Sequence, residues 1–264
     1  MENPRKYGLP PFKAALIHGG PGAAGELSPV AAVLSEDISV LEPLQTAGSL
    51  DGQVAELKNI LEKDGGSPFV LAGFSWGAWL AFILAARHPG LVKKLILISS
   101  GPFEEKYAHT ITEARFARLS VVERALAGEL IKQVEGPDAP DRAGAFARLG
   151  GLLSKTDAYD PEPGNDVRDG AVMLDADIFQ KVWRDAALFR RGGGLMAAAN
   201  LIKCPVTAIH GDYDPHPAGG VREPLEAVIK DFSFILLKDC GHRPWIEKAA
   251  KKTFYEVLKK EVKM

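Results

Sequence analysis

The chain has 264 residues, of which 46% are hydrophobic and 25% are charged, a composition typical of a globular protein rather than a disordered or membrane one. Its formal net charge of -2 argues against nucleic acid as a partner, because phosphate binding needs a concentrated basic face. The N-terminus lacks the apolar run of a signal peptide, and no later stretch is long enough to span a bilayer. We therefore expect a cytoplasmic protein that binds neither nucleic acid nor membranes. Two cysteines, Cys204 and Cys240, do not make a disulfide framework.

Six short apolar runs along the chain predict the strands of one sheet. They are nearly continuous rather than alternating, which indicates parallel strands covered on both faces. The runs are Lys13–Ile17, Ile38–Leu41, Phe69–Ala72, Leu95–Ile98, Val206–Ile209 and Phe234–Leu237. Helices are predicted between them, one starting with Ser28 as its cap, one over Leu50–Leu61 and one over Ala78–Arg87. This alternation predicts an α/β fold, with a mostly parallel sheet of about six strands and helices on both faces.

The alternation stops between residues 103 and 200, where helical stripes occur and no convincing strand is found. One predicted stripe consists of Leu119, Val122, Leu126 and Leu130. We interpret residues 103–200 as a helical cap inserted into a core formed by residues 1–102 and 201–264. Four large side chains of the cap are candidate pocket walls, although packing within their own lobe explains them more simply. These are Phe179, Trp183, Phe189 and Met196.

A candidate nucleophile lies between the predicted strand Phe69–Ala72 and the helix Ala78–Arg87. The connecting pentapeptide Gly73–Gly77 has Ser75 at its centre. A serine on a tight strand-to-helix turn is held in strained geometry that exposes its hydroxyl above the sheet edge. The two glycines allow strand and helix to approach closely, and Trp76 begins the helix with a free backbone N–H beside the serine.

A serine hydroxyl needs a base to accept its proton and a third group to orient that base. His242 follows the last predicted strand, and Asp214 follows the strand before it. Parallel strands bring the loops at their carboxyl ends to one edge, so Ser75, Asp214 and His242 are expected to meet there. Asp212 is the rival acid, and Asp214 is preferred because it lies farther past its strand.

The segment His18–Gly22 follows the first predicted strand and is a candidate oxyanion loop. Acyl transfer needs hydrogen-bond donors aimed at the developing oxyanion. The backbone N–H groups of Gly20 and Trp76 are the expected donors, and His18 is interpreted as a residue that shapes the loop.

Two other patterns suggest different functions. Residues Gly20–Gly25 match the dinucleotide-binding fingerprint Gly-x-Gly-x-x-Gly, with Glu42 about twenty residues farther on. Pro21 removes a backbone N–H from that turn, and the next helix starts after the third glycine rather than within the motif. The run His210–His216 has plausible metal ligands at every second residue, but an extended segment places them in a line rather than a cage. We therefore expect no cofactor and no metal.

Together, Gly73–Gly77, Asp214 and His242 resemble the α/β-hydrolase superfamily over nearly the whole chain, with residues 103–200 in the place of its helical cap. The segment before Lys13 is too short for the two leading strands usual in that superfamily. The turn Gly73–Gly77 takes the place of the nucleophile elbow of that superfamily. Ser75 at its centre disfavours the Asp nucleophile of the related epoxide hydrolases and dehalogenases. The resemblance implies a serine hydrolase acting on a small-molecule ester, thioester or amide, and gives no oligomeric state.

Two alternatives remain open at this point. The segment His18–Gly22 is similar to that of proline iminopeptidases, in which cap carboxylates hold a free amine, and Glu104 and Glu105 are the nearest candidates here. A lyase or a ligand-binding receptor with the same fold is the non-hydrolytic alternative.

Overall fold

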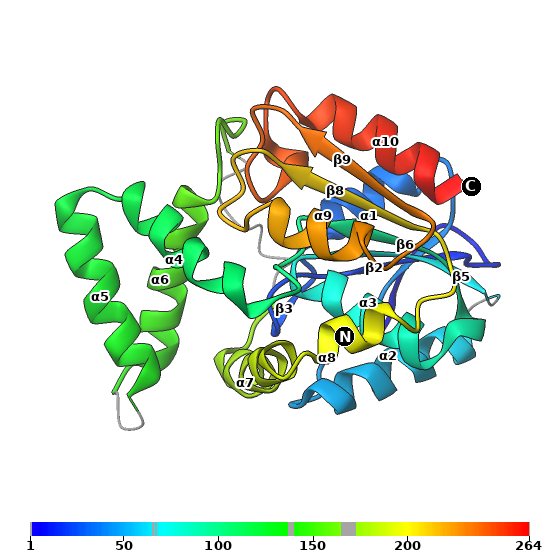
Figure 1. Ribbon diagram of the computed structural model, residues 1–264, viewed down its shortest axis with the longest axis horizontal. Coiled ribbons are helices and arrows are strands. Elements are labelled where there is room, and N and C mark those ends of the chain that lie inside the picture. Colours follow the sequence, from blue (N-terminus) through cyan, green and yellow to red (C-terminus); the bar gives the residue numbers. More distant parts are fainter. Residues whose placement is uncertain (1, 65, 67, 137–139, 165–172, 264) are drawn as a thin grey trace.

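The computed structural model describes residues 2–64, 66, 68–136, 140–164 and 173–263, and the core of the molecule is a seven-stranded sheet (Figure 1). Its strand order is β1-β4-β2-β5-β6-β8-β9, and every neighbouring pair is parallel except β1 and β4. The strands are β1 (Arg5–Tyr7), β2 (Ala14–Ile17), β4 (Val40–Glu42), β5 (Phe69–Phe74), β6 (Val92–Ile98), β8 (Val206–Gly211) and β9 (Phe232–Leu237). All six predicted strands are present. The three-residue β1 is an addition that the sequence pattern did not indicate.

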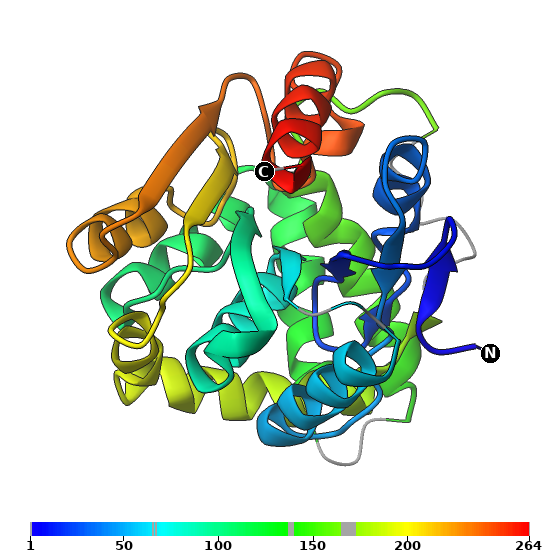
Figure 2. The ribbon, with the colours of Figure 1, turned by 90° about the vertical axis from the view of Figure 1, so that its right-hand side faces the viewer.

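Helices cover both faces of this sheet, as Figure 2 shows. One face packs against α2 (Leu50–Asp64), α3 (Trp76–Arg87), α8 (Gly194–Ala199) and α9 (Gly219–Glu226). The other face packs against α1 (Ser28–Leu34) and α10 (Lys251–Lys263). Alternate strand residues divide between the two cores, since Leu71 belongs to the first and Val70 and Ala72 belong to the second. The expected α/β fold is confirmed.

Helix α1 begins one residue earlier than predicted. Leu27 occupies the N-cap position, so Ser28 is the first helical residue and makes no capping hydrogen bond. Short 3₁₀ turns occur at Pro89–Leu91, Glu105–Tyr107 and Pro244–Ile246. Both cysteines are free. Among the described residues, no helix has the length and apolarity that crossing a bilayer requires.

Three helices project from the sheet, beyond the arrowheads of β8 and β9 (Figure 1). They are α4 (Ala108–Ala117), α5 (Val121–Glu135) and α6 (Arg142–Thr156), and we call them the outer helices. They surround a small hydrophobic cluster of their own, formed by Leu119, Ala127, Leu130, Ala145 and Leu149.

The stripe predicted for this region is wrong at two of its four positions, because Val122 is 78% exposed and Leu126 is 40% exposed. Ser120 caps α5 through a capping box with Glu123, so Leu119 precedes the helix and does not define its buried face. That face is formed instead by Ala127 and Leu130.

Two further helices of the predicted insertion pack on the main core rather than on the outer helices. Helix α7 (Ala176–Arg191) contributes Val182 and Ala186 to the core of the first sheet face, and α8 contributes Leu195. A two-residue strand that the sequence did not predict, β7 (Met173–Leu174), pairs with β3 (Ala23–Ala24) in a separate small sheet. The division into a core and an insertion at residues 103–200 stays a proposal, and within it the packing separates the outer helices from α7 and α8.

Candidate active site

The turn between β5 and α3 holds Ser75 in a strained backbone conformation. Its φ of 52° and ψ of -114° lie in a region that residues with a side chain rarely adopt. Strand and helix approach so closely here that a Cβ on Gly73 would lie 2.2 Å from the carbonyl oxygen of Gly77. A Cβ on Gly77 would lie 2.1 Å from the carbonyl oxygen of Ile17 on the neighbouring strand. The two glycines are therefore required by the turn, as the sequence pattern predicted.

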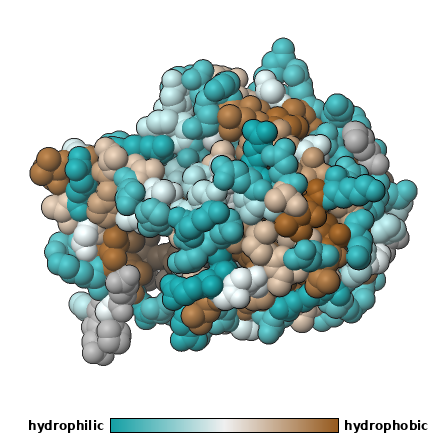
Figure 3. Space-filling view, viewed as in Figure 1, coloured by the Kyte–Doolittle hydropathy of each residue, from teal (hydrophilic) through white to brown (hydrophobic). Residues whose placement is uncertain are grey.

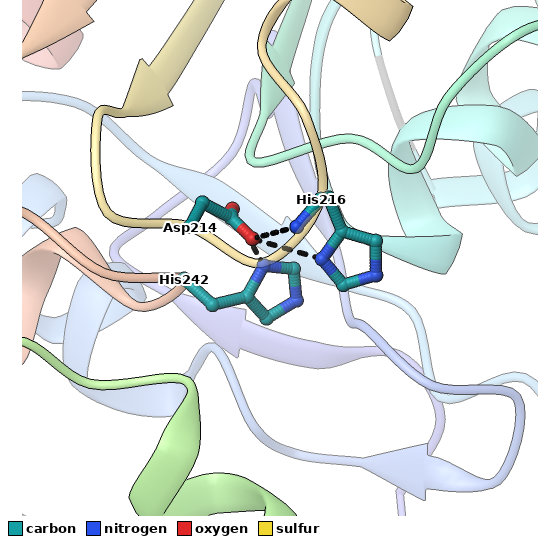
Figure 4. A group of neighbouring side chains, drawn as sticks. All are labelled: Asp214, His216 and His242. Atoms are coloured by element: carbon teal, nitrogen blue, oxygen red, sulfur yellow. Dashed lines mark hydrogen bonds and ion pairs between the residues drawn. The ribbon is translucent and has the colours of Figure 1, made fainter. Parts of the chain in front are cut away.

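The loops after β8 and β9 bring Asp214 and His242 into direct contact. Nδ1 of His242 lies 2.8 Å from Oδ2 of Asp214, which places Nε2 on the far side of the imidazole ring (Figure 4). The rival acid points elsewhere, because Asp212 accepts a hydrogen bond from the backbone N–H of Cys240 and pairs with Lys238. Of the two candidate acids, Asp214 is the one that contacts His242.

A second imidazole shares the same carboxylate. Nδ1 of His216 lies 2.8 Å from Oδ1 of Asp214, and the His216 backbone N–H donates to the same oxygen at 2.9 Å (Figure 4). The rings of His216 and His242 are stacked with centroids 4.4 Å apart. Behind them, Nε2 of His210 donates to the His216 carbonyl oxygen at 2.8 Å. The sequence pattern contained His210 and His216 only as possible metal ligands and did not indicate this support for Asp214.

Burial and neighbouring charge set the protonation of this group. Burial by itself raises the pKa of Asp214, but the nearby imidazoles of His242, His216 and His210 outweigh it and hold that pKa well below its usual range. Burial, followed by the positive charge of His242, lowers the pKa of His216 to about 4. At neutral pH, His216 is therefore uncharged and donates its Nδ1 proton to the Asp214 carboxylate.

The loop after β2 is shaped by His18, as the sequence suggested. This histidine is fully buried, its Nδ1 donates to the carbonyl oxygen of Gly19 at 2.8 Å, and its Nε2 accepts the backbone N–H of Gln45. Burial lowers the pKa of His18, consistent with a neutral ring that bridges two backbone segments. Gly20 follows with a positive φ of 28°. The peptide around it takes a conformation that favours glycine.

A cavity of about 710 Å³ joins these elements. Its wall includes four of the five expected groups, namely Gly20, Ser75, Trp76 and His242, whereas Asp214 is not among the lining residues. The ring of Phe74, directly before Ser75, lies 4.8 Å from the His242 ring, measured between centroids. Figure 3 shows the surface hollowed between the outer helices and the rest of the molecule. Three of these sheet-side groups stand on loops at the carboxyl ends of strands, and Trp76 begins the helix that follows one.

The four predicted pocket walls divide into two pairs. Phe179 and Trp183 line the cavity, and Trp183 also stacks on Trp79 of α3 with centroids 5.9 Å apart. Phe189 and Met196 pack against the main core and are not among the residues that line the cavity.

The segment after α6 is fastened to the His242 loop by Asp157. Its carbonyl oxygen accepts the backbone N–H of His242 at 2.7 Å. Its buried carboxylate accepts two hydrogen bonds from Arg115 of α4, one from Nε at 2.8 Å and one from Nη2 at 2.7 Å. Burial opposes ionisation, but the Arg115 guanidinium holds the pKa of Asp157 below its usual value.

The buried carboxylate of Glu247 links the same two segments through a second set of hydrogen bonds. Its oxygens accept the backbone N–H groups of Gly241, Tyr159 and Asp160 at 2.8–3.0 Å. The chain beside His242 is thereby tied to the chain that leaves the outer helices. Neither Asp157 nor Glu247 belongs to a sequence motif, so pattern analysis missed both.

The arrangement bears on metal and cofactor binding as well. Asp214, His216 and His242 place possible ligand atoms within 4.8 Å of one another. Both carboxylate oxygens already accept imidazole N–H groups, and a metal bound there would displace those hydrogen bonds. Asp212 points away from this group, so the four residues of the run His210–His216 do not form one set. Helix α1 starts three residues after Gly25, which leaves the Gly20–Gly25 turn without the helix N-terminus that binds a pyrophosphate.

This fold, with its elbow and its paired histidine and aspartate, defines the class of the chain. Residues 15–254 match the Alpha/beta hydrolase family, so the chain belongs to that family. The resemblance seen in the sequence is confirmed.

Particular relatives show the same fold at low sequence identity. VinJ superposes with a TM-score of 0.71 at 18% identity, covering 98% of this chain and 94% of that one. A monoacylglycerol lipase from Paleococcus ferrophilus gives 0.67 at 17% identity, covering 99% and 98%. A proline iminopeptidase from Mycobacterium smegmatis gives 0.66 at 18% identity, covering 98% and 93%.

One sequence relative is much more local. Epoxide hydrolase 4 from Mus musculus is 38% identical over 55 residues, which is 21% of this chain and 15% of that protein. The chain therefore matches only a small part of that protein.

Proposed function

We propose that the protein is a serine hydrolase that cleaves a carboxylic ester, thioester or small amide of a small-molecule substrate. One observation carries the proposal: Ser75 stands in strained geometry on a cavity wall that also holds His242, and His242 is bonded to Asp214. This arrangement leaves His242 Nε2 available to accept a proton while Nδ1 stays bonded to the carboxylate. Hydrolytic relatives with the same fold add support.

In this proposal, the oxygen of Ser75 attacks the substrate carbonyl carbon and its proton passes to Nε2 of His242. Asp214 orients the ring and stabilises its charge, and His216 holds the other oxygen of that carboxylate. The backbone N–H groups of Gly20 and Trp76 donate to the oxyanion, and Trp76 has no intrahelical acceptor because it is the first residue of α3. The tetrahedral intermediate collapses to an acyl-serine as His242 protonates the leaving group. Water then attacks the acyl group while His242 takes its proton, and His242 returns that proton to the Ser75 oxygen as the bond between this oxygen and the acyl carbon breaks and the acid leaves.

A fluorophosphonate probe tests the nucleophile directly. Wild-type protein is expected to form one covalent adduct at Ser75, identified by peptide mass spectrometry. Ser75→Ala is expected to form none and to lose about 1,000-fold or more in kcat on any ester that the wild type cleaves. Labelling that is equal in both proteins would remove Ser75 from the mechanism. An unlabelled, inactive wild type would favour a non-hydrolytic lyase or receptor.

A further inference from the structure

One acidic side chain of the cavity has no role in the mechanism above. Glu26 lies between β3 and α1, is 9% exposed and lines the cavity together with Ser75. A Cβ built on Gly19 would lie 2.8 Å from Oε2 of Glu26 and 2.6 Å from the ring of Phe74. The carboxylate therefore lies over the segment that leads to Gly20 and close to the residue that precedes Ser75.

Among the described residues, Glu26 has no hydrogen-bond or ion-pair partner, and its charge acts on the buried ring of His18 only through space. A carboxylate with so little exposure is costly unless it is paired, and buried polar groups in folded proteins are nearly always satisfied. The carboxylate lines the cavity, so a cation that enters it would supply this pairing.

The cationic side chains of the cavity wall are already engaged. Arg115 is bonded twice to Asp157, and Nε of Arg190 lies 2.9 Å from the carboxylate of Glu105. Arg243 donates to a serine hydroxyl of α6. Among the described charged groups of the wall, Glu26 is the one without a hydrogen-bond or ion-pair partner, which favours a cationic ligand at its oxygens.

We propose that Glu26 binds a protonated amine of the substrate, so that the enzyme acts on amino-substituted acyl esters or amides. This inference rests on the proposed function, because it places the ammonium group on a substrate whose carbonyl reaches Ser75. A charge-assisted N–H···O hydrogen bond in a cavity of low polarity is stronger than the same contact in water. It selects an amine over an isosteric alkyl group.

The carboxylates that the sequence suggested for this task are occupied elsewhere. Glu104 pairs with Lys106 at 2.8 Å, and Glu105 pairs with Arg190. Neither belongs to the cavity wall. The amine-binding group therefore comes from the loop after the first parallel strand, on the same side of the cavity as the expected oxyanion donors.

A substrate series tests the proposal through a ratio of rates. Methyl esters of alanine, β-alanine and γ-aminobutyrate are compared with those of propionate and butyrate, by kcat/KM. We expect at least one amino ester to exceed its neutral counterpart by about tenfold or more, and Glu26→Gln to abolish that preference. Glu113→Gln, which changes an exposed carboxylate on α4 outside the cavity, is the matched control and is expected to keep the preference. A preference unchanged in Glu26→Gln, or a wild type that favours the neutral esters throughout, would overturn the proposal.

A binding measurement separates this proposal from the proposed function. Ser75→Ala, with and without Glu26→Gln, is titrated calorimetrically with alaninamide and with propionamide. We expect alaninamide to bind about tenfold more weakly when Glu26 is replaced, with no such change for propionamide. If binding depends on Glu26 while the wild-type protein hydrolyses none of the esters, the amine site stands and the hydrolase proposal fails. If the wild-type protein hydrolyses the esters but replacing Glu26 changes the affinity for neither ligand, the hydrolase proposal stands and the amine site is refuted. Glu26→Gln is also expected to melt no lower than wild type, since removing an unpaired buried charge does not destabilise the fold.

Discussion

The cavity has two walls that are built in different ways. The sheet wall, with Ser75 and the Gly20 loop, is formed where backbone segments are in direct contact. A Cβ on Gly77 would lie 2.1 Å from the carbonyl oxygen of Ile17. The outer helices form the opposite wall around a small cluster of five buried residues. They are fastened near His242 by polar contacts, chiefly those of Asp157 and Glu247.

This difference separates two requirements of an enzyme. Groups that react must keep their geometry, and close backbone packing on the sheet wall leaves them little freedom. Groups that select a substrate must admit it, and an element with few buried contacts opens at lower free energy. We therefore expect the sheet wall to tolerate little change and the outer helices to depend on a few ion pairs and hydrogen bonds.

The largest loss of stability is expected when the ion pair between Arg115 and Asp157, which holds the outer helices near His242, is broken. Arg115→Met leaves the buried Asp157 carboxylate without its partner, which typically costs about 3–5 kcal/mol of unfolding free energy. Adding Asp157→Asn to this variant should recover much of the loss, because the uncompensated charge is removed. Urea denaturation measures both.

An exposed ion pair of the same helices is the control for that comparison. Lys155 of α6 pairs with Glu123 of α5 at 2.7 Å on the surface. Lys155→Ala should change stability far less than Arg115→Met. Equal effects of the two substitutions would contradict a fastening centred on Asp157.

The second prediction compares a glycine of each region. Gly77→Ala forces backbone atoms apart at the elbow and should cost about 3 kcal/mol or more. Gly128 lies inside α5 with open space around its Cβ position, so Gly128→Ala should stabilise by about 0.5–1 kcal/mol. Thermal and urea unfolding check both signs. Tolerance of alanine at position 77 would show that the sheet wall is less tightly packed than its distances indicate.

The third prediction concerns acid stability at the boundary between the walls. His216 has a pKa of about 4 in the folded protein and about 6.5 when unfolded. Between these values the unfolded chain binds one more proton than the folded one, so acidification favours unfolding. The loss is about 3 kcal/mol from pH 6.5 to pH 4. The neighbouring Asp214 adds nothing in this window, because its lowered pKa places its own loss at more acid pH.

His216→Asn isolates that contribution. The asparagine amide nitrogen takes the place of Nδ1 and can still donate to Asp214, but it does not titrate. Denaturation at several pH values should therefore give a flatter profile for this variant between pH 6.5 and pH 4. A profile as steep as that of wild type would assign the acid sensitivity to other groups.

The smallest effect is expected from backbone strain at Ser75. A non-glycine residue at a φ of 52° stores about 1–3 kcal/mol, and a glycine in its place relieves part of that strain. Ser75→Gly should therefore be about 1 kcal/mol more stable than Ser75→Ala, although neither retains the nucleophile. Thermal unfolding of the two variants side by side measures the difference. If the alanine variant were the more stable, the turn would not be strained.

Sequence patterns located the elements that recur along the chain. Buried parallel strands are nearly continuous apolar runs, and all six predicted strands are present. The pattern was less informative for short or irregular elements. β1 has only three residues, and the stripe drawn through Leu119 failed because a capping box at Ser120 starts the helix after it. Local capping chemistry, rather than hydrophobic spacing, decided that boundary.

By itself, the sequence determined the fold class and the chemical identity of the candidate nucleophile, acid, base and oxyanion donors. These follow from local rules, since a serine between two glycines and a histidine after a strand can be recognised from neighbouring residues. Only the tertiary structure decided that Asp214 rather than Asp212 contacts His242, that His216 shares the same carboxylate, and that Glu26 lines the cavity without a partner. Such facts depend on which side chains meet across the fold and on what is left unpaired when they have met. Hydrophobic periodicity and short motifs contain no information about these long-range contacts or about the groups that they leave unpaired.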